Sequence, residues 1–342
     1  MTTDALADTA TRPSEGPEER SVRLPEVLRG LVARYALVLG WALMALYFYL
    51  QVPELFGTSG TFRSIFGSQQ AIVLVFLGMA ALITLVVGEF DLSIASVMAI
   101  SATTVAVLGG LHDVNIWLAC LAGLGVAVLA GIVNAFFVVV VGVSSFVVTL
   151  GMGTLLAGVS QMLSNNTYVS VNSPDLGDLA RTPFLGMPVA FYYGVAVVLV
   201  LAYLFAWTPL GRSMLFVGAN PEVARLAGIR VQVIRFGAYV AGALLAGVAG
   251  LIVVASVGSF DNSTAMSYLL PALAAVFLGA AVVQPGVFNP IGTLIAVYFL
   301  QTGIFGLQLL GYDIWIQNVF YGGGLVLAVA LAKVVRDRST TA

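Results

Sequence analysis

Long apolar runs separated by short polar breaks form the dominant pattern of this chain. A transmembrane helix needs about 20 consecutive apolar residues, and ten windows in the sequence approach that length. They are Arg34–Leu50, Gly67–Val87, Leu92–Leu108, Ile116–Val141, Phe146–Leu163, Val189–Trp207, Phe236–Val257, Leu269–Val283, Ile291–Leu309 and Ile314–Ala332. The pattern predicts an all-α protein that crosses a membrane about ten times. The short window Leu269–Val283 is also compatible with a re-entrant segment.

Composition agrees with a polytopic integral membrane protein. Hydrophobic residues make up 60% of the 342 positions and charged residues 9%, whereas a soluble domain carries about 25% charged residues. The single histidine, His112, lies outside the windows. A Ser–His pair or a metal cluster within the bilayer is therefore not expected, which disfavours a membrane enzyme. No metal site and no nucleic-acid partner are predicted.

The basic residues orient the predicted spans. With ten spans and a cytoplasmic N-terminus, 12 of the 14 Lys and Arg residues fall on the cytoplasmic side, in agreement with the positive-inside rule. They are Arg12, Arg20, Arg23, Arg29, Arg34, Arg212, Arg225, Arg230, Arg235, Lys333, Arg336 and Arg338. Only Arg63 and Arg181 fall outside. Both termini are therefore predicted to be cytoplasmic.

The chain divides into three parts on this basis. Residues 1–33 are polar and acidic and are predicted to form a disordered cytoplasmic tail. Residues 34–335 form the transmembrane domain, which includes a hydrophilic cytoplasmic loop at residues 208–235. Residues 336–342 form a second cytoplasmic tail.

Two carboxylates interrupt the apolar pattern in the segment Gly88-Glu89-Phe90-Asp91-Leu92-Ser93. A charged side chain at the bilayer centre costs roughly 2.5–3.5 kcal/mol even on lenient insertion scales, so such residues face a cavity or a partner. A glycine in front of them indicates a break between two membrane helices, as in transporters that line a path with polar groups. The break predicts that the protein moves a solute. Asp91 is also placed to cap the next helix, which is compatible with a position along the path.

The loop at residues 208–235 contains the signals of a short helix. Asn220 is placed to cap it, Pro221 suits its first position and Glu222 complements its positive end. Gly228 can adopt the left-handed conformation that ends a helix. One face of this helix is apolar and is formed by Val223, Leu226 and Ala227. The helix therefore either docks to a soluble partner or connects two spans along the membrane surface.

At residues 88–96, 134–151 and 211–229, three sequence blocks resemble the permeases of ribose-type ABC transporters, the branched-chain and monosaccharide permease family. Residues 88–96 resemble its Gly-Gly-x-Asp-Leu-Ser-x-Gly-Ser signature, although Glu89 and Ala95 stand where the family usually has Gly. Asn134-Ala135-Phe136 with residues 145–151 resembles its Asn-Gly and Pro-Phe-Ile-Val-Thr-Leu-Gly block. Gly211-Arg212 with residues 218–229 resembles its cytoplasmic loop. The blocks occur in family order, and the resemblance covers roughly residues 71–332.

The resemblance implies a type II ABC importer-like permease that works with other subunits. Such a permease pairs in the membrane with a second copy or a paralogue. It receives a small neutral polar solute, typically a monosaccharide, from an extracytoplasmic solute-binding protein, and a cytoplasmic ABC ATPase drives it. The chain would lie in the inner membrane in contact with lipid, without a cofactor. Its only lysine, Lys333, follows Ala332, so it has no P-loop of its own and ATP would bind to the partner.

The candidate site residues fall into two groups. The predicted substrate path comprises Glu89, Asp91, Ser93, Asn134, Phe146 and Thr149. Predicted coupling to the ATPase involves Arg212, Asn220, Glu222, Arg225, Leu226 and Gly228. Asn134 could instead form an interhelical hydrogen bond, and Phe146 could pack rather than contact solute.

The alternative function is a proton-coupled secondary transporter in which Glu89 or Asp91 carries the proton. This alternative explains the carboxylates but not the capped cytoplasmic helix or the ordered family blocks. A further pattern is structural: small residues recur at every fourth position and predict a ridge that lets another helix approach closely. They are Ala238, Gly242, Ala246 and Gly250.

Overall fold

The computed structural model describes residues 24–340. Residues 1–23 of the N-terminal tail, which is predicted at residues 1–33, lie outside this part. Helices dominate it, which confirms the all-α prediction. They are α1 (Leu24–Gln51), α2 (Pro53–Phe56), α3 (Ser59–Phe66), α4 (Gln69–Val86), α5 (Ile94–Ala106), η1 (Val107–Leu111), α6 (Ile116–Ala135), η2 (Phe136–Val141), α7 (Ser145–Leu163), α8 (Pro174–Arg181), α9 (Val189–Trp207), α10 (Pro209–Ala219), α11 (Pro221–Leu226), α12 (Val231–Val257), η3 (Asn262–Tyr268), α13 (Leu269–Gly279), α14 (Pro290–Leu309) and α15 (Trp315–Thr340).

Each of the ten predicted windows corresponds to a helix, but several boundaries differ. α12 begins at Val231, within the predicted loop at residues 208–235, and α13 ends at Gly279, before the predicted Val283. The largest differences are at the two ends of the chain. α1 begins at Leu24, upstream of the predicted start, and α15 runs to Thr340 through most of the predicted 336–342 tail. Residues 341–342 lie outside the described part. Eight segments of that part are long and apolar enough to cross a membrane, and Tyr35–Gln51 is a shorter apolar helix. A count of about ten crossings therefore stays a prediction.

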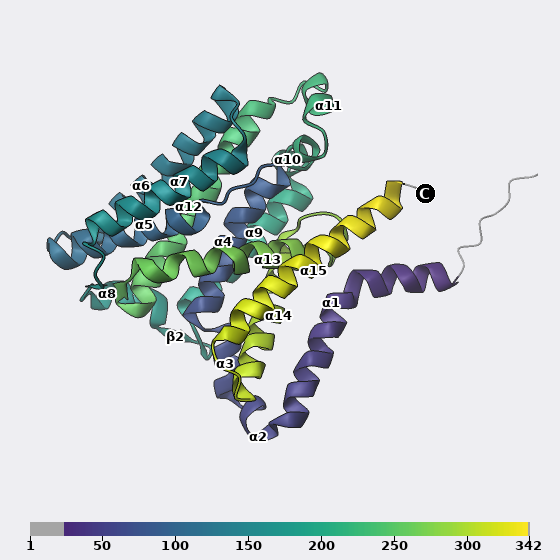
Figure 1. The fold of residues 1–342 in the computed structure, drawn as a ribbon, viewed down its shortest axis with the longest axis horizontal. Helices are drawn as coiled ribbons and strands as arrows, with labels where there is room; N and C mark the ends of the chain where they lie inside the picture. The colour runs from purple at the N-terminus through teal and green to yellow at the C-terminus, as the bar shows by residue number, and fades with distance from the viewer. Residues whose placement is uncertain (1–23, 341–342) are drawn as a thin grey trace, which may run out of the picture.

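Two small sheets lie at the end of the molecule opposite α10 and α11. β1 (Val169–Ser170) pairs antiparallel with β4 (Ser259–Phe260), and β2 (Pro183–Phe184) pairs with β3 (Met187–Pro188). In Figure 1, α8 and β2 lie at one end of the helices, whereas α10 and α11 lie at the other. α9 connects the two ends, because it starts after β3 and leads directly into α10. The predicted outside and cytoplasmic loops therefore occupy opposite ends.

The core lies around α4 and α12. α4 is buried along nearly its whole length, and Figure 1 shows it in the middle of the molecule. α12 packs against α4, α5 and α6, and its small residues make this packing close. A Cβ at Gly242 would lie 3.1 Å from the Ala80 carbonyl oxygen, and one at Gly250 would lie 2.5 Å from that of Met98. The predicted small-residue ridge is therefore confirmed as a packing surface.

We expect Gly250→Leu to destabilise the fold. Its side chain would overlap the α5 backbone, and overpacking of this kind costs roughly 1–3 kcal/mol. Gly237→Leu on the same helix is the control, because a Cβ at Gly237 meets nothing within 4 Å. The apparent melting temperature in detergent should fall for Gly250→Leu and stay near wild type for Gly237→Leu. Equal shifts for the two variants would contradict the close α5–α12 approach.

Candidate functional site

The predicted break between two membrane helices lies between α4 and α5. α4 ends at Val86, and Gly88 adopts a left-handed conformation with φ of +82°, which glycine adopts without steric cost. The amide of Glu89 then donates to the Thr84 carbonyl oxygen at 3.0 Å, and α5 begins only at Ile94. Residues 88–93 therefore form a non-helical segment with two carboxylates, as predicted from the sequence.

A buried polar cluster surrounds the second carboxylate. Asp91 Oδ1 accepts hydrogen bonds from the backbone amide and the hydroxyl of Ser93, at 2.9 and 2.6 Å. Asn134 Nδ2 of α6 donates to the Ser93 hydroxyl at 2.8 Å. Asp91 is 3% exposed, and Ser93 and Asn134 are fully buried. Asp91 accepts from the Ser93 amide as predicted, but it is not the cap of α5, because Ser93 is the N-cap residue and no side chain caps this helix end. The Asn134 contact is the interhelical hydrogen bond predicted as an alternative.

Two features of the cluster bear on what it can bind. Thr149 of α7 is fully buried, and its hydroxyl accepts from the Leu92 amide at 3.1 Å. Asn134 Oδ1 is buried and has no hydrogen-bond partner within the described part of the chain. A buried acceptor left unpaired costs about 1–3 kcal/mol. The cluster therefore offers one acceptor that a donor such as a hydroxyl would satisfy.

The first carboxylate has separate partners. Glu89 is 5% exposed and forms an ion pair with Arg235 of α12. The hydroxyl of Tyr239, one helical turn further along α12, donates to Glu89 Oε2 at 3.3 Å. From the sequence, Arg235 is predicted only to be a cytoplasmic charge, and no role is predicted for Tyr239. The signal available was their i, i+4 spacing, which places both polar side chains on one helix face.

The aromatic residue predicted for the path is exposed, unlike the polar residues of the cluster. Phe146 is 54% exposed on the first turn of α7. Phe90, which lies between the two carboxylates, is 43% exposed and stacks on Phe277 of α13 with 6.4 Å between ring centroids. Five of the six predicted path residues are therefore buried at the break, and Phe90 adds an exposed aromatic surface there.

The predicted short helix in the loop at residues 208–235 is present as α11. Asn220 Oδ1 accepts from the amides of Glu222 and Val223, both at 3.1 Å, and Gly228 is left-handed with φ of +82°. Leu226 is 89% exposed and Val223 is 45% exposed. The charged residues of this loop that were predicted to act in coupling are also exposed, namely Arg212, Glu222 and Arg225. α11 therefore presents an apolar face that is not covered within the described part of the chain.

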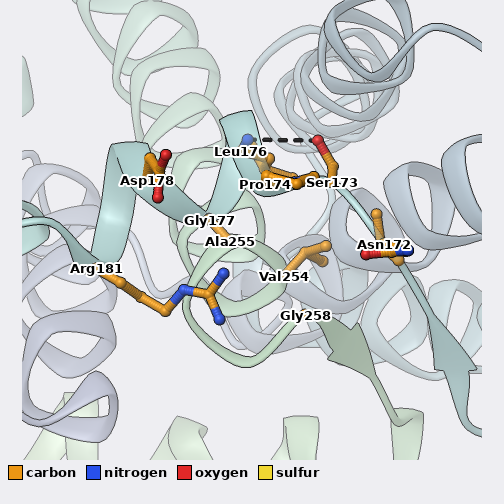
Figure 2. A pocket seen from close by; sticks show the side chains of 11 residues that line it. Asn172, Ser173, Pro174, Leu176, Gly177, Asp178, Arg181, Val254, Ala255 and Gly258 are labelled. Carbon is orange, nitrogen blue, oxygen red and sulfur yellow. Dashed lines mark hydrogen bonds between the residues drawn. The ribbon is translucent and has the colours of Figure 1, made fainter.

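A polar cavity of about 280 Å³ lies at the opposite end, between α8 and α12. Figure 2 shows Arg181 reaching back along α8 toward Gly177 and Val254. A Cβ at Gly177 would overlap this guanidinium, so the glycine makes room for it. Among the described residues, Arg181 forms no ion pair. No group of three or more His, Cys, Asp or Glu residues in the described part could hold a metal ion.

Comparison with known proteins adds sequence relationships. The family model described as "Branched-chain amino acid transport system / permease component" matches residues 64–329. The chain is 30% identical to the galactofuranose transporter permease protein YtfT of Escherichia coli (strain K12), over 91% of this chain and 89% of YtfT. It is 30% identical to the ribose import permease protein RbsC of the same organism, over 81% and 86%. It is 27% identical to the L-arabinose ABC transporter permease protein AraH of Azospirillum brasilense, over 90% of each chain.

We expect Ser93→Ala to destabilise the protein through the buried cluster. The substitution removes the acceptor of Asn134 and one donor to Asp91, and an unsatisfied buried group costs about 1–3 kcal/mol. Ser96→Ala, in the first turn of α5, is the control, since the one hydrogen bond of the Ser96 hydroxyl within the described part of the chain is to the Met266 sulfur at 3.5 Å, a weak acceptor. Thermal unfolding in detergent should show a larger loss for Ser93→Ala. A loss no greater than that of Ser96→Ala would argue against the network.

Proposed function

This chain belongs to the family of branched-chain amino acid transport system permease components, and we propose that it translocates a neutral monosaccharide as the membrane subunit of an ABC importer. The names of three relatives concern galactofuranose, L-arabinose and ribose, which favours a sugar over an amino acid. Membership of the ABC permease family implies an ATPase and a solute-binding protein as partners.

The polar break between α4 and α5 is the observation that carries the proposed path. Asp91, Ser93, Asn134 and Thr149 bring carboxylate, hydroxyl and amide groups together among apolar helices. The unpaired Asn134 Oδ1 can accept a hydrogen bond from a sugar hydroxyl. Carboxylates near the path disfavour anionic solutes. The exposed ring of Phe146 would line the path from α7, whereas the Glu89 carboxylate is already paired with Arg235.

α11 is the proposed docking site for the ATPase. Its exposed residues Val223 and Leu226 provide apolar contact area, and Glu222 and Arg225 flank them with opposite charges. Asn220 and Gly228 fix the helix ends by local contacts, so the docking face is formed before the partner binds. Arg212 on α10 would lie at the edge of this interface. In this orientation both chain termini are cytoplasmic.

A second permease copy or a paralogue is the proposed partner of α7. This helix is the least buried of the eight candidate spans in the described part, with 22% of its window buried. Gly151 and Gly158 lie on the same face of α7, about two helical turns apart. A Cβ at either position would meet nothing within 4 Å. Small residues of this kind allow a second helix to approach closely in a membrane. Membrane lipid would cover the remaining apolar faces.

The solute-binding protein would dock at the end that carries α8. The cavity there contains the guanidinium of Arg181, which forms no ion pair with any residue that the structure describes, together with Asp178 and Asn172. These groups can bind polar side chains of a soluble partner. Because α8 and α11 lie at opposite ends of the molecule (Figure 1), delivery and energy input would occur on opposite sides of the membrane.

Leu226→Asp should uncouple transport while membrane insertion stays intact. A charge in place of the exposed leucine would be buried without a partner when the ATPase docks, which is strongly unfavourable. Leu226→Met is the control, because it keeps an apolar side chain of similar size. In reconstituted complexes, solute-stimulated ATP hydrolysis should be lost for Leu226→Asp and kept for Leu226→Met. Stimulation at the wild-type level in Leu226→Asp would refute α11 as the docking site.

Uptake should depend on ATP and not on the proton gradient. Cells or vesicles supplied with ATP should continue to accumulate the sugar after a protonophore collapses the gradient, and ATP depletion should stop uptake. Radiolabelled ribose, arabinose and galactose supplied with the cognate solute-binding protein would serve as the test panel. Loss of uptake upon protonophore addition at constant ATP would instead support a proton-coupled carrier that uses Glu89 or Asp91.

A further inference from the structure

The ion pair between Glu89 and Arg235 connects two parts of the protein that the proposed function treats separately. Glu89 belongs to the α4–α5 break, and Arg235 is the last residue of the predicted loop at residues 208–235, which already lies in the first turns of α12. It is the one ion pair among the residues that the structure describes. Burying a charge of this kind in a membrane protein is costly without a specific role, and path lining does not require this contact.

A second contact connects the same two parts. The end of α10 lies against the end of α4, where a Cβ at Gly218 would overlap the Val86 carbonyl oxygen and lie 3.4 Å from the Gly88 amide nitrogen. Gly218 and Arg235 flank α11 in the chain. The loop at residues 208–235 therefore holds the break by a backbone contact before α11 and by an ion pair after it.

The opposite side of the break is held by α7. Ser145 Oγ accepts from the Phe90 amide at 3.4 Å, and Thr149 Oγ1 accepts from the Leu92 amide at 3.1 Å. The Thr149 hydroxyl also donates to the Phe90 carbonyl oxygen at 3.4 Å. These are all hydrogen bonds between neutral groups, which are weaker than contacts to charged groups. A displacement of the loop would therefore carry Glu89 with it and shift Asp91 relative to α7.

We propose that Glu89 is a positioning residue that latches the break to α12 and transmits movement of the α10–α11 loop to the path. This inference rests on the proposed function, since the loop moves when the ATPase acts. In this proposal Glu89 does not contact the solute, because both of its carboxylate oxygens have partners. Oε1 pairs with Arg235, and Oε2 accepts a hydrogen bond from Tyr239. Asp91, two residues further on, remains the carboxylate of the path.

The charge-reversed pair tests the latch directly. Glu89→Gln and Arg235→Gln should each raise the number of ATP molecules hydrolysed per sugar transported by several-fold in the reconstituted complex, with the KM for uptake unchanged. The double variant Glu89→Arg/Arg235→Glu keeps an ion pair with its polarity reversed and should recover much of the wild-type ratio. Arg230→Gln is the matched control, because it removes a positive charge next to α12 from a residue exposed to solvent.

A second measurement is independent of ATP and of the sugar. In a Cys120→Ser background, Phe90→Cys places a thiol at an exposed position of the break. Adding Glu89→Gln should speed its reaction with a small charged thiol reagent, because the break is released from α12. Adding the charge-reversed pair should return the rate toward that of the parent.

The outcomes separate the latch from its alternatives. A Glu89 that binds solute predicts a raised KM in Glu89→Gln and no recovery in the charge-reversed variant, and this result would overturn the proposal. An unchanged labelling rate in Glu89→Gln would overturn it as well. If the wild-type complex itself fails to couple uptake to ATP, the proposed function is wrong, while the labelling rates still decide whether the pair holds the break.

Discussion

Two carboxylates between apolar helices must find their partners inside the protein, because lipid offers neither hydrogen bonds nor opposite charges. Arg235 and Tyr239 of α12 supply them for Glu89, and the amide and hydroxyl of Ser93 supply them for Asp91. α6 and α7 contribute through hydrogen bonds to the same segment. One short break thus determines which faces of three helices carry polar groups, and the remaining faces are free to be apolar.

The need to bring a partner on α12 to Glu89 also explains the positions of the small residues on α12. Arg235 reaches the break only if α12 lies close to α4, and this helix also packs on α5 and α6. At Gly242 and Gly250 the neighbouring backbone leaves no space for a larger side chain without a shift. Close packing in a membrane depends on such contacts, because lipid provides no hydrophobic drive between helices. The polar contact and the small-residue ridge are therefore two parts of one interface.

What the sequence predicted and what it missed differ in the range of the interactions involved. The break at Gly88 and the helix between Asn220 and Gly228 depend on contacts within a few residues, and both are present as predicted. The helix windows also follow from local apolarity. α1 starts before its predicted window, because a search for apolar residues leaves out its polar first turns. The partner of Glu89 lies 146 positions away in the chain, and only the packing of α12 against α4 reveals it. Burial is similarly non-local, which is why the exposure of Phe146 was not foreseen.

Local contacts within α11 and long-range contacts of α10 and α12 together indicate how a small surface helix would act on the buried break. α11 is only six residues long, and isolated helices of that length are unstable in water. It persists because Asn220 satisfies its first amides, while Ala224 is buried and anchors it to the protein. α11 is therefore held in place on the protein, and its apolar face remains exposed. α11 lies between α10 and α12 in the chain, and these are the elements whose residues Gly218 and Arg235 touch the break. In the proposed mechanism, a partner that binds at the surface would act on the buried polar cluster through these contacts.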